Sequence, residues 1–500
     1  MRAEEFIAEA GRPYTGAEYI ESLRDGREVY MNGERVADIP SHPAFRNSVR
    51  SIARLYDAMH AESTKDLLTR PIEGGGYTFR YFLPSASKEE LIASQQAIAT
   101  WSRLNYGWMG RTPDFKAGWT NTLGINSQFY GPYAENARAW YKRSMTVPFL
   151  NHSIVNPPID RHLPVAETKD VFISVEKETD AGIIVSGAKV VATSAAMTHY
   201  NFIGQNSKTA TDDLDMALMF IAPTNAPGVK LFSRVSYEQA ATSPFDYPLS
   251  SRFDENDAII VLDKVFVPWE DVLIYRDPKR VLSWYPSSGS QNGFLFQGCT
   301  RFAVKLDFLC GALSKSLHCT GGDELRSNQV LLGEALAWRN LFWSLSHMMA
   351  NKPDPFVDGY VLPNGQAAIS YRVFAPEAYP RMKELIQKAM TSALIYLPSS
   401  VKDLDNPDSA PYLAKYVRGS HGIDYKSRIK TLKLLWDAVG TEFGGRHELY
   451  ERNYAGAWED IRAQTLMTAQ RSHDLEKLES MVDKCLSEYD ESGWTDAAWR

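Results

Sequence analysis

Apolar residues change their spacing twice along this chain of 500 residues. In residues 50–60 and 88–101 they recur every three or four positions, which is the period of a helix with one buried face. Ser87 and Glu90 have the spacing of a capping box at the start of the second run. The pattern therefore predicts a helical domain over residues 1–147.

From about residue 170 apolar residues alternate with polar ones, which is the period of a strand. The alternating run 171–177, the turn at 180–182 and the apolar run 183–185 predict a hairpin. Further strands and proline turns are expected at 187–193, 216–221, 258–262, Pro223, Pro227 and Pro248. These segments predict a β domain over residues 148–277.

Helical spacing returns after Pro286, and the predicted helices are longer. They are expected at residues 294–317, 324–350, 376–397, 425–439 and 459–488. Gly321 and Gly322 follow the first of these helices, as is typical of a glycine C-cap. Residues 278–500 are thus expected to form a helical bundle, and the order of the three domains predicts the α+β class.

Composition predicts a well-packed globular protein, because 44% of the residues are hydrophobic and 12% are aromatic. The formal charge of -7 is spread along the chain without a basic stripe, which argues against nucleic acid as a partner. Glu4 and Glu5 stand where a signal peptide needs an apolar run, and no run approaches the roughly 20 apolar residues that cross a membrane. We therefore expect a cytoplasmic protein that is not bound to a membrane.

The four cysteines, Cys299, Cys310, Cys319 and Cys485, have none of the spacings that hold a metal ion, so no metal site is predicted. So few scattered cysteines in a long chain favour reduced thiols, which are typical of a cytoplasm. The sequence also lacks the usual motifs of a Rossmann cofactor site, a P-loop, a zinc peptidase and a serine hydrolase. A redox cofactor would therefore need a different groove and would have to be reduced elsewhere.

Residues 107–115 concentrate the groups that a pocket for a flat aromatic molecule needs. They include glycines at a bend, the fixed cation of Arg111, a turn set by Pro113 and three aromatic or thioether side chains. A second candidate is His152, expected on a loop ahead of the β domain, whose imidazole can exchange a proton with a phenol. A single histidine is more often structural, so the residue alone leaves both roles open.

Three more segments leave a structural and a functional role open. In residues 187–199 small side chains let a flat ring approach, and the hydroxyl of Thr193 can bind a polar ring edge or its own turn. The polar segment 204–213 fits a solvated surface loop at least as well as a binding loop. The glycine-rich segment 440–456, with Arg446, can break a helix or bring backbone and a cation to a phosphate.

Residues 109–115, 151–161 and 443–456 carry a resemblance to a known family. They resemble the MGR-(S/T)-PDY, histidine and FGGRHELYE segments of the oxygenase components of two-component 4-hydroxyphenylacetate 3-monooxygenases and related phenol hydroxylases. The agreement extends over nearly the whole chain, from Pro13 to Thr495. It implies the acyl-CoA dehydrogenase-like fold, in which flavin lies between a β domain and helical domains.

The resemblance also implies a reaction and an assembly. A separate flavin reductase supplies diffusible FADH2, and O2 adds to it to give a flavin C4a-hydroperoxide. The enzyme then hydroxylates a para-substituted phenol ortho to its hydroxyl, and the product is a catechol. Relatives of this kind are homotetramers, so a homotetramer is expected.

The family assigns roles to residues that match positions of this chain. Arg111 and His152 are expected to be catalytic. The phenol is expected to contact Arg111, Phe115, His152, Asn206 and Ser207. FAD is expected to contact His152, Ser153, Ile154, Pro158, Ile159, Asp160, Arg161, Thr193, Tyr454, Ala455, Gly456 and Ala457.

Phe115 departs from the family pattern, which has tyrosine at this position. Tyrosine can form a hydrogen bond with the phenol oxygen and phenylalanine cannot, and one such bond contributes about 0.5–1.5 kcal/mol. The substrate is therefore left open between 4-hydroxyphenylacetate and a different or bulkier phenol, such as a tyrosine-derived secondary metabolite, a hydroxycinnamate or a halophenol.

Three other classes of protein make different demands on the sequence. A non-catalytic aromatic-binding homologue would explain Phe115, but Arg111 and His152 are both retained. The 4-hydroxybutyryl-CoA dehydratases need an N-terminal cysteine pair for an iron–sulfur cluster, and no cysteine precedes Cys299. An acyl-CoA dehydrogenase would keep FAD through purification, whereas a flavin-borrowing oxygenase would purify mostly without it.

Overall fold

The computed structural model describes residues 11–160, 162–205 and 213–499. Helices precede and follow a region of strands along the chain, which confirms the predicted α+β class. None of the described helices is long and apolar enough to span a bilayer. The predicted division of the chain at residues 147 and 277 stays a prediction.

The first segment contains helices, as predicted, and also strands. The helices are α2 (Gly16–Ser22), α3 (Arg46–Ala58), α4 (Lys65–Leu68), α5 (Lys88–Leu104), α6 (Pro113–Ile125) and α7 (Ala134–Ser144). The Ser87 hydroxyl accepts a hydrogen bond from the Glu90 N–H, so the predicted start of α5 is confirmed. The Glu90 carboxylate accepts from the N–H of Ala86 instead of Ser87, so the capping box is only half formed.

A six-stranded sheet forms the larger part of the β region. In spatial order its strands are β2 (Glu34–Arg35), β1 (Glu28–Met31), β10 (Val229–Ser233), β11 (Asp257–Pro268), β7 (Gly182–Thr193) and β6 (Ser174–Thr179). The N-terminal strand β1 pairs in parallel with β10. The first segment therefore contributes to the sheet and is not purely helical. Strand β1 was not predicted because four residues are too few to show the spacing of a strand.

Strand β7 is one strand of 12 residues, where two strands were predicted at 183–185 and 187–193. Gly187 continues the strand at a φ of 125°, and a Cβ there would lie 2.4 Å from the carbonyl carbon of Phe172. The glycine allows a close approach of two chain segments and does not mark a turn. That prediction was wrong because a glycine inside a strand was interpreted as its end.

A second sheet of four strands lies next to the helices. Its spatial order is β12 (Val272–Tyr275), β9 (Leu218–Pro223), β8 (Tyr200–Ile203) and β5 (Leu150–Ser153). Strand β5 pairs in parallel with β8 and carries His152 opposite Phe202. The prediction of a loop at His152 was therefore wrong, since its partner strand lies about 50 residues away and leaves no local signal.

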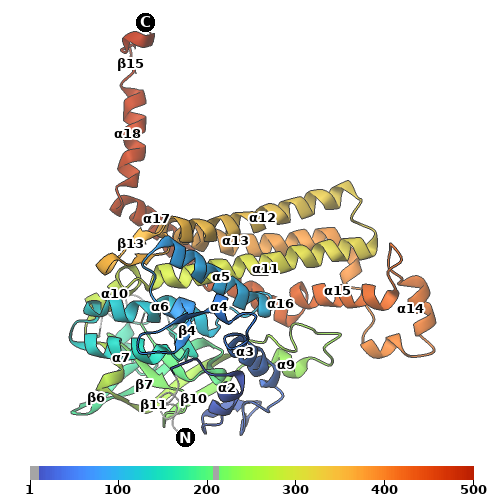
Figure 1. The fold of residues 1–500 in the computed structure, drawn as a ribbon, viewed down its shortest axis with the longest axis horizontal. Coiled ribbons are helices and arrows are strands. Elements are labelled where there is room, and N and C mark those ends of the chain that lie inside the picture. Colours follow the sequence, from blue (N-terminus) through green and yellow to red (C-terminus); the bar gives the residue numbers. More distant parts are fainter. Residues whose placement is uncertain (1–10, 161, 206–212, 500) are drawn as a thin grey trace.

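The C-terminal half is built from long helices. They are α10 (Pro278–Ser287), α11 (Ser290–Thr320), α12 (Arg326–Asn351), α13 (Gly365–Met390), α14 (Ala410–Tyr416), α15 (Tyr425–Val439), α16 (Glu442–Asn453), α17 (Trp458–Arg471) and α18 (Asp474–Leu486). In Figure 1 helices α11, α12 and α13 lie side by side across one side of the body, and the strands lie on the opposite side. Helices α5 and α6 pack against α11 and lie between the long helices and the strands.

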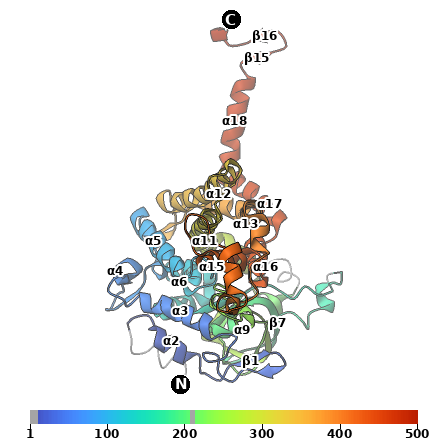
Figure 2. The ribbon, with the colours of Figure 1, turned by 90° about the vertical axis from the view of Figure 1, so that its right-hand side faces the viewer.

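Minor elements complete the described chain. They are α9 (Tyr237–Ala240), β3 (Thr69–Pro71), β4 (Tyr77–Phe79), β13 (Asp354–Pro355), β14 (Val361–Leu362), β15 (Tyr489–Asp490) and β16 (Gly493–Trp494). The single helix predicted at 459–488 is wrong, because His473 adopts a left-handed φ of 58° between α17 and α18. Helix α18 projects away from the body in both Figure 1 and Figure 2.

Buried apolar side chains form two separate clusters. The larger one runs through the N-terminal helices, the six-stranded sheet and the bundle. The smaller one is mainly aromatic and includes Phe115, Trp119, Phe202, Trp284 and Phe294. It joins α6, the four-stranded sheet, α10 and the start of α11, and it carries the candidate site.

Candidate active site

A cavity of about 560 Å³ lies where β5, β7 and β11 meet α6, α10, α11, α13 and α16. It is lined by Arg111, Phe115, His152, Ile154, Val155, Val191, Thr193, Asp257, Tyr285, Gln291, Phe294, Leu295, Arg372, Arg446, Leu449, Tyr450, Asn453, Tyr454 and Ala455. Its volume is in the range of cofactor and small-molecule sites, and most of its lining is apolar or aromatic.

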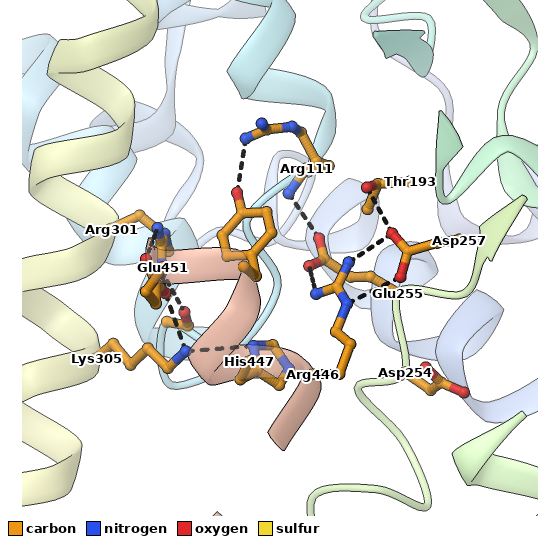
Figure 3. Close-up of polar contacts among 12 residues, drawn as sticks. Arg111, Thr193, Asp254, Glu255, Asp257, Arg301, Lys305, Arg446, His447 and Glu451 are labelled. Atoms are coloured by element: carbon orange, nitrogen blue, oxygen red, sulfur yellow. Dashed lines mark hydrogen bonds and ion pairs between the residues drawn. The ribbon is translucent and has the colours of Figure 1, made fainter. Parts of the chain in front are cut away.

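Arg111 lies on the turn before α6 and is fixed by both halves of the molecule. Its backbone N–H donates to Glu255 Oε1 at 2.6 Å, and its guanidinium donates to the Tyr450 hydroxyl at 2.6 Å (Figure 3). The guanidinium lies 4.0 Å from the ring centre of Phe115 and 4.8 Å from that of Tyr454. Within the described chain it forms no ion pair, so its charge is available to a ligand.

Phe115 is buried in the first turn of α6, in contact with the guanidinium of Arg111 and the ring of Phe294. One face meets the Arg111 guanidinium, and the ring of Phe294 is stacked 4.7 Å away. The ring of His152 meets it edge to face at 5.7 Å. Hydrogen bonds to a ligand here must therefore come from neighbouring groups, of which the Tyr285 hydroxyl lies 3.3 Å from His152 Nε2.

His152 reaches the cavity from β5, and its other ring nitrogen is in contact with a lysine. Nδ1 of the imidazole is in hydrogen-bond contact with the amine of Lys116, whose side chain is fully buried. Burial, followed by the charges of Lys116 and Arg111, lowers the pKa of His152 well below its usual value. The imidazole is therefore neutral at physiological pH, and one of its nitrogens remains an acceptor.

Thr193 lies at the end of β7, and its hydroxyl donates to Asp257 Oδ1 at 2.7 Å. The same carboxylate pairs with Arg446 at 2.8 Å (Figure 3). It also pairs with Arg234 at 3.0 Å. Arg446 also pairs with Glu255. Arg446 is thus neutralised inside the protein. The glycine-rich segment breaks the helical path at Gly440, between α15 and α16, while Gly444 and Gly445 lie inside α16.

Behind the cavity a buried ionic cluster joins α11 to α16. Glu451 accepts from the guanidinium of Arg301 and, at 2.9 Å, from the amine of Lys305 (Figure 3). Lys305 also lies 3.2 Å from His447 Nδ1. Burial would raise the pKa of Glu451, but Arg301 and Lys305 hold it at about 2, so the carboxylate stays charged.

The structure brings several of the predicted site residues to one cavity. Its lining includes Arg111, Phe115, His152, Ile154, Thr193, Tyr454 and Ala455. Among the other predicted contacts with described positions, the lining does not include Ser153, Pro158, Ile159, Asp160, Gly456 and Ala457. Arg161, Asn206 and Ser207 lie outside the described residues.

Several cavity residues had no signal in the sequence. Lys116, which contacts His152, was missed because α6 is buried on nearly every side, so spacing does not mark one functional face. Arg372 was missed because Pro376 and Pro380 were expected to start a helix, whereas both lie inside α13. Tyr285 stands directly before Pro286, and helical spacing was expected to return only after that proline.

Among the described residues, one group of potential metal ligands lies away from the cavity. His318 and His421 both contact the carboxylate of Asp323 near the C-terminal end of α11. The two imidazole rings are stacked in parallel 4.2 Å apart. All three side chains are partly exposed, and none of them contributes to the cavity.

Two family models match the chain over most of its length. The model described as "4-hydroxyphenylacetate 3-hydroxylase N terminal" matches residues 15–274 and the one described as "4-hydroxyphenylacetate 3-hydroxylase C terminal" matches residues 281–487. The chain belongs to this family. The resemblance found in the sequence is thereby confirmed.

Relatives in the 4-hydroxyphenylacetate 3-hydroxylase family are named for different phenols. The 4-hydroxyphenylacetate 3-monooxygenase oxygenase component of Pseudomonas aeruginosa is 56% identical over 99% of this chain and 96% of its own. The 4-nitrophenol 2-monooxygenase oxygenase component of a Rhodococcus species is 51% identical over 97% and 94%.

A solved structure of the family has the same fold. It is a 4-hydroxyphenylacetate 3-monooxygenase oxygenase component complexed with FAD and 4-hydroxyphenylacetate. The TM-score is 0.89 at 30% sequence identity, and the similarity covers 95% of this chain and 99% of that chain.

Proposed function

We propose that this protein is the oxygenase component of a flavin-dependent phenol hydroxylase, which uses O2 and FADH2 from a separate reductase to convert a para-substituted phenol to a catechol. The observation that carries the proposal is the pair formed by unpaired Arg111 and neutral His152 on one aromatic cavity. Both groups suit a phenol oxygen that is losing its proton. Family membership supports the same reaction.

The residues of the cavity fit a flavin. Ile154, Val191 and Leu449 supply apolar surface for the faces of a flat ring. The Thr193 hydroxyl donates its hydrogen bond to Asp257, so its lone pairs are free to accept a hydrogen bond from an N–H at a ring edge. Arg372 forms no ion pair within the described chain and can face a phosphate. The bound flavin would supply the activation of O2.

The phenol is proposed to lie at the aromatic end of the cavity. Phe115 and Phe294 offer parallel ring surfaces and exclude water from the reacting atoms. The positive charge of Arg111 stabilises a phenolate oxygen, and His152 takes up or shares its proton. Loss of that proton raises the electron density on the ortho carbon, which is the carbon that is hydroxylated.

The identity of the phenol is the second part of this proposal. Phe115 cannot supply the hydrogen bond that tyrosine gives in relatives, so a phenol other than 4-hydroxyphenylacetate is favoured. A tyrosine-derived secondary metabolite, a hydroxycinnamate and a halophenol are the proposed alternatives. The other flavin contacts proposed from the family are Ser153, Pro158, Ile159, Asp160, Arg161, Gly456 and Ala457, and those proposed for the phenol are Asn206 and Ser207.

A single-turnover experiment tests the proposal. The protein is mixed without oxygen with FADH2 and one phenol of a panel, and then with O2, and the products are identified by mass spectrometry. We expect a catechol from at least one phenol, with little hydrogen peroxide. Stoichiometric hydrogen peroxide without any catechol over the whole panel would instead favour a non-catalytic aromatic-binding homologue.

The proposal extends to assembly and location. We expect a homotetramer in the cytoplasm that receives FADH2 by diffusion from its reductase. The exposed apolar residues Leu478, Met481 and Val482 on the projecting helix α18 are available to contact other subunits. Light scattering at several concentrations measures the assembly. Hydroxylation with the reductase kept behind a dialysis membrane tests whether a direct complex is needed.

A further inference from the structure

Lys116 is a fully buried lysine beside the candidate site. A buried lysine is normally paired with a carboxylate, because an isolated ammonium group is costly to desolvate. In the part of the chain that the structure describes, Lys116 forms no ion pair. Its amine is in hydrogen-bond contact with Nδ1 of His152.

Four aromatic rings surround the amine of Lys116. Its Nζ lies 4.9 Å from the ring centre of Phe202, 5.0 Å from Phe294, 5.5 Å from Phe115 and 5.9 Å from Trp119. Such a cage carries no hydrogen-bond acceptor for an ammonium, yet its ring faces stabilise a positive charge once one is formed. The surroundings therefore suit an amine that is neutral at rest and charged for part of a reaction.

The titratable and charged groups that face this pair come from two elements. Arg111 approaches from the turn before α6, and Tyr285 approaches His152 from α10. The described neighbours from β8 and α11 that pack against the pair are Phe202 and Phe294, which do not titrate. Burial, followed by the charge of Arg111, lowers the pKa of Lys116 well below its usual value.

We propose that Lys116 is the proton acceptor behind His152 when the phenol ionises. The phenol O–H bond breaks and an N–H bond forms at His152 Nε2. At the same time the N–H bond at Nδ1 breaks and a new N–H bond forms at Lys116 Nζ. A neutral phenol and a neutral amine become a phenolate and an ammonium, and the imidazole ends neutral with its proton on the other nitrogen.

This inference rests on the proposed function, because it assumes that a phenol lies against His152. Lys116 then acts through the histidine and is a positioning residue for the proton. The proton stays inside the protein, so phenolate forms without loss of a proton to solvent. The charge of Arg111 reaches both Lys116 and His152, and the new ammonium adds to it in stabilising the phenolate.

The test measures phenolate and protons separately, with 4-nitrophenol as the probe and without flavin. Absorbance reports how much bound nitrophenol is ionised, and titration calorimetry in buffers of different ionisation enthalpy reports how many protons are released. At a pH below the solution pKa of the probe, wild type is expected to bind phenolate and to release about zero protons per site. Release of about one proton per phenolate would overturn the proposal.

Variants separate a proton acceptor from a fixed charge. In Lys116→Met the ionisation of bound nitrophenol is expected to move up by at least about one pH unit, which is a tenfold change. In Lys116→Arg the charge is permanent, so each bound phenolate should release about one proton. A folded Lys116→Met protein that titrates like wild type, or a Lys116→Arg protein that releases none, would overturn the proposal.

Lys189→Met is the matched control. Lys189 is also fully buried, but its amine donates to Asn156 at 2.6 Å and to Gln205 at 2.7 Å, away from the cavity lining. This variant should retain the wild-type ionisation and proton count. If the Lys116 variants do not fold, the wild-type proton count still decides. The proposed hydroxylation is tested separately by the FADH2 experiment, so the two can fail independently.

Discussion

Individual residues of the site divide into those that the sequence could predict and those it could not. Arg111, His152 and Thr193 were predicted and line one cavity, since each carries chemistry in a motif of its own. Lys116 and Tyr285 were not predicted. Both are important only through their contacts with His152, which is distant in the sequence and lies on another element. Contacts of this kind arise only from tertiary structure.

Phe115→Tyr tests how one missing hydroxyl shapes substrate preference. The new hydroxyl should bind the phenol oxygen and raise kcat/KM for 4-hydroxyphenylacetate relative to bulkier phenols by about 2- to 13-fold, which corresponds to about 0.5–1.5 kcal/mol. Steady-state hydroxylation of a phenol panel by both proteins measures the change. Equal preference in both proteins would contradict this explanation of the substitution.

Arg111→Met tests the unpaired charge at the cavity. A hydrogen bond to a charged group is worth about 1.5–3 kcal/mol, so kcat/KM should fall about 10- to 150-fold. Arg111→Lys keeps the charge but loses the planar contact with Phe115, and it should fall between Arg111→Met and wild type. Equal values of kcat/KM in wild type, Arg111→Met and Arg111→Lys would show that Arg111 has a structural role only.

At the scale of elements, spacing predicted long amphipathic segments well. Helix α15 has the predicted bounds, and Gly321 ends α11 in a left-handed conformation as expected. The errors fall where a residue rule was overridden by packing: two prolines lie inside α13, and one glycine lies inside β7. Short buried strands such as β5 also lack enough residues for a period.

The crossing of α6 and α11 positions Phe115 against Phe294 and depends on two glycines. A Cβ at Gly293 would lie 1.9 Å from the carbonyl oxygen of Gly118. Gly293→Ala should therefore lower the free energy of unfolding by about 1–3 kcal/mol and weaken phenol binding, since the helices must separate. Denaturant unfolding and binding titrations measure both effects.

Gly311→Ala on the same helix is the control for this prediction. A Cβ at Gly311 would meet no atom within 4 Å, so alanine should stabilise α11 by about 0.5–1 kcal/mol through helix propensity alone. If both substitutions stabilise the protein, the glycine contact does not hold the two helices in place.

At the scale of the whole molecule, the cavity exists because three parts of the chain meet there. Its walls come from the turn before α6, from the ends of β5 and β7, and from α11, α13 and α16. Ion pairs join these parts, at Asp257 with Arg446 in the cavity wall and at Glu451 with Arg301 behind it. Sequence spacing predicts the elements of each part. It does not predict that the parts come together in space, because that depends on these long-range ion pairs.

Glu451→Gln tests the buried pair between α11 and α16. Arg301 and Lys305 would lose their carboxylate, and breaking a buried pair typically costs about 3–5 kcal/mol of unfolding free energy. Tyr450 and Tyr454 flank this position on the chain, so phenol affinity should fall as well. Chemical denaturation at neutral pH gives the loss of stability.

The ion pairs of Glu451 also make the stability of the protein depend on pH in the acid range. The pKa of Glu451 is about 2 in the folded protein against an ordinary value of 4.5, so its contribution is complete above about pH 4.5 and is lost as the pH falls towards 2. Glu451→Gln should lack this part of the acid dependence. Glu135→Gln, at an exposed pair with Arg138, should retain it. A wild-type acid profile in Glu451→Gln would contradict the assignment.

The two apolar clusters have a consequence for the history of this fold. The aromatic residues beneath the site belong to the smaller cluster, while most of the chain is held together by the larger one. A substitution that reshapes the pocket therefore disturbs a local set of rings and leaves the main core intact. New substrates can therefore be accommodated by a few such substitutions before folding is compromised, and Phe115 is the position at which we expect one in this chain.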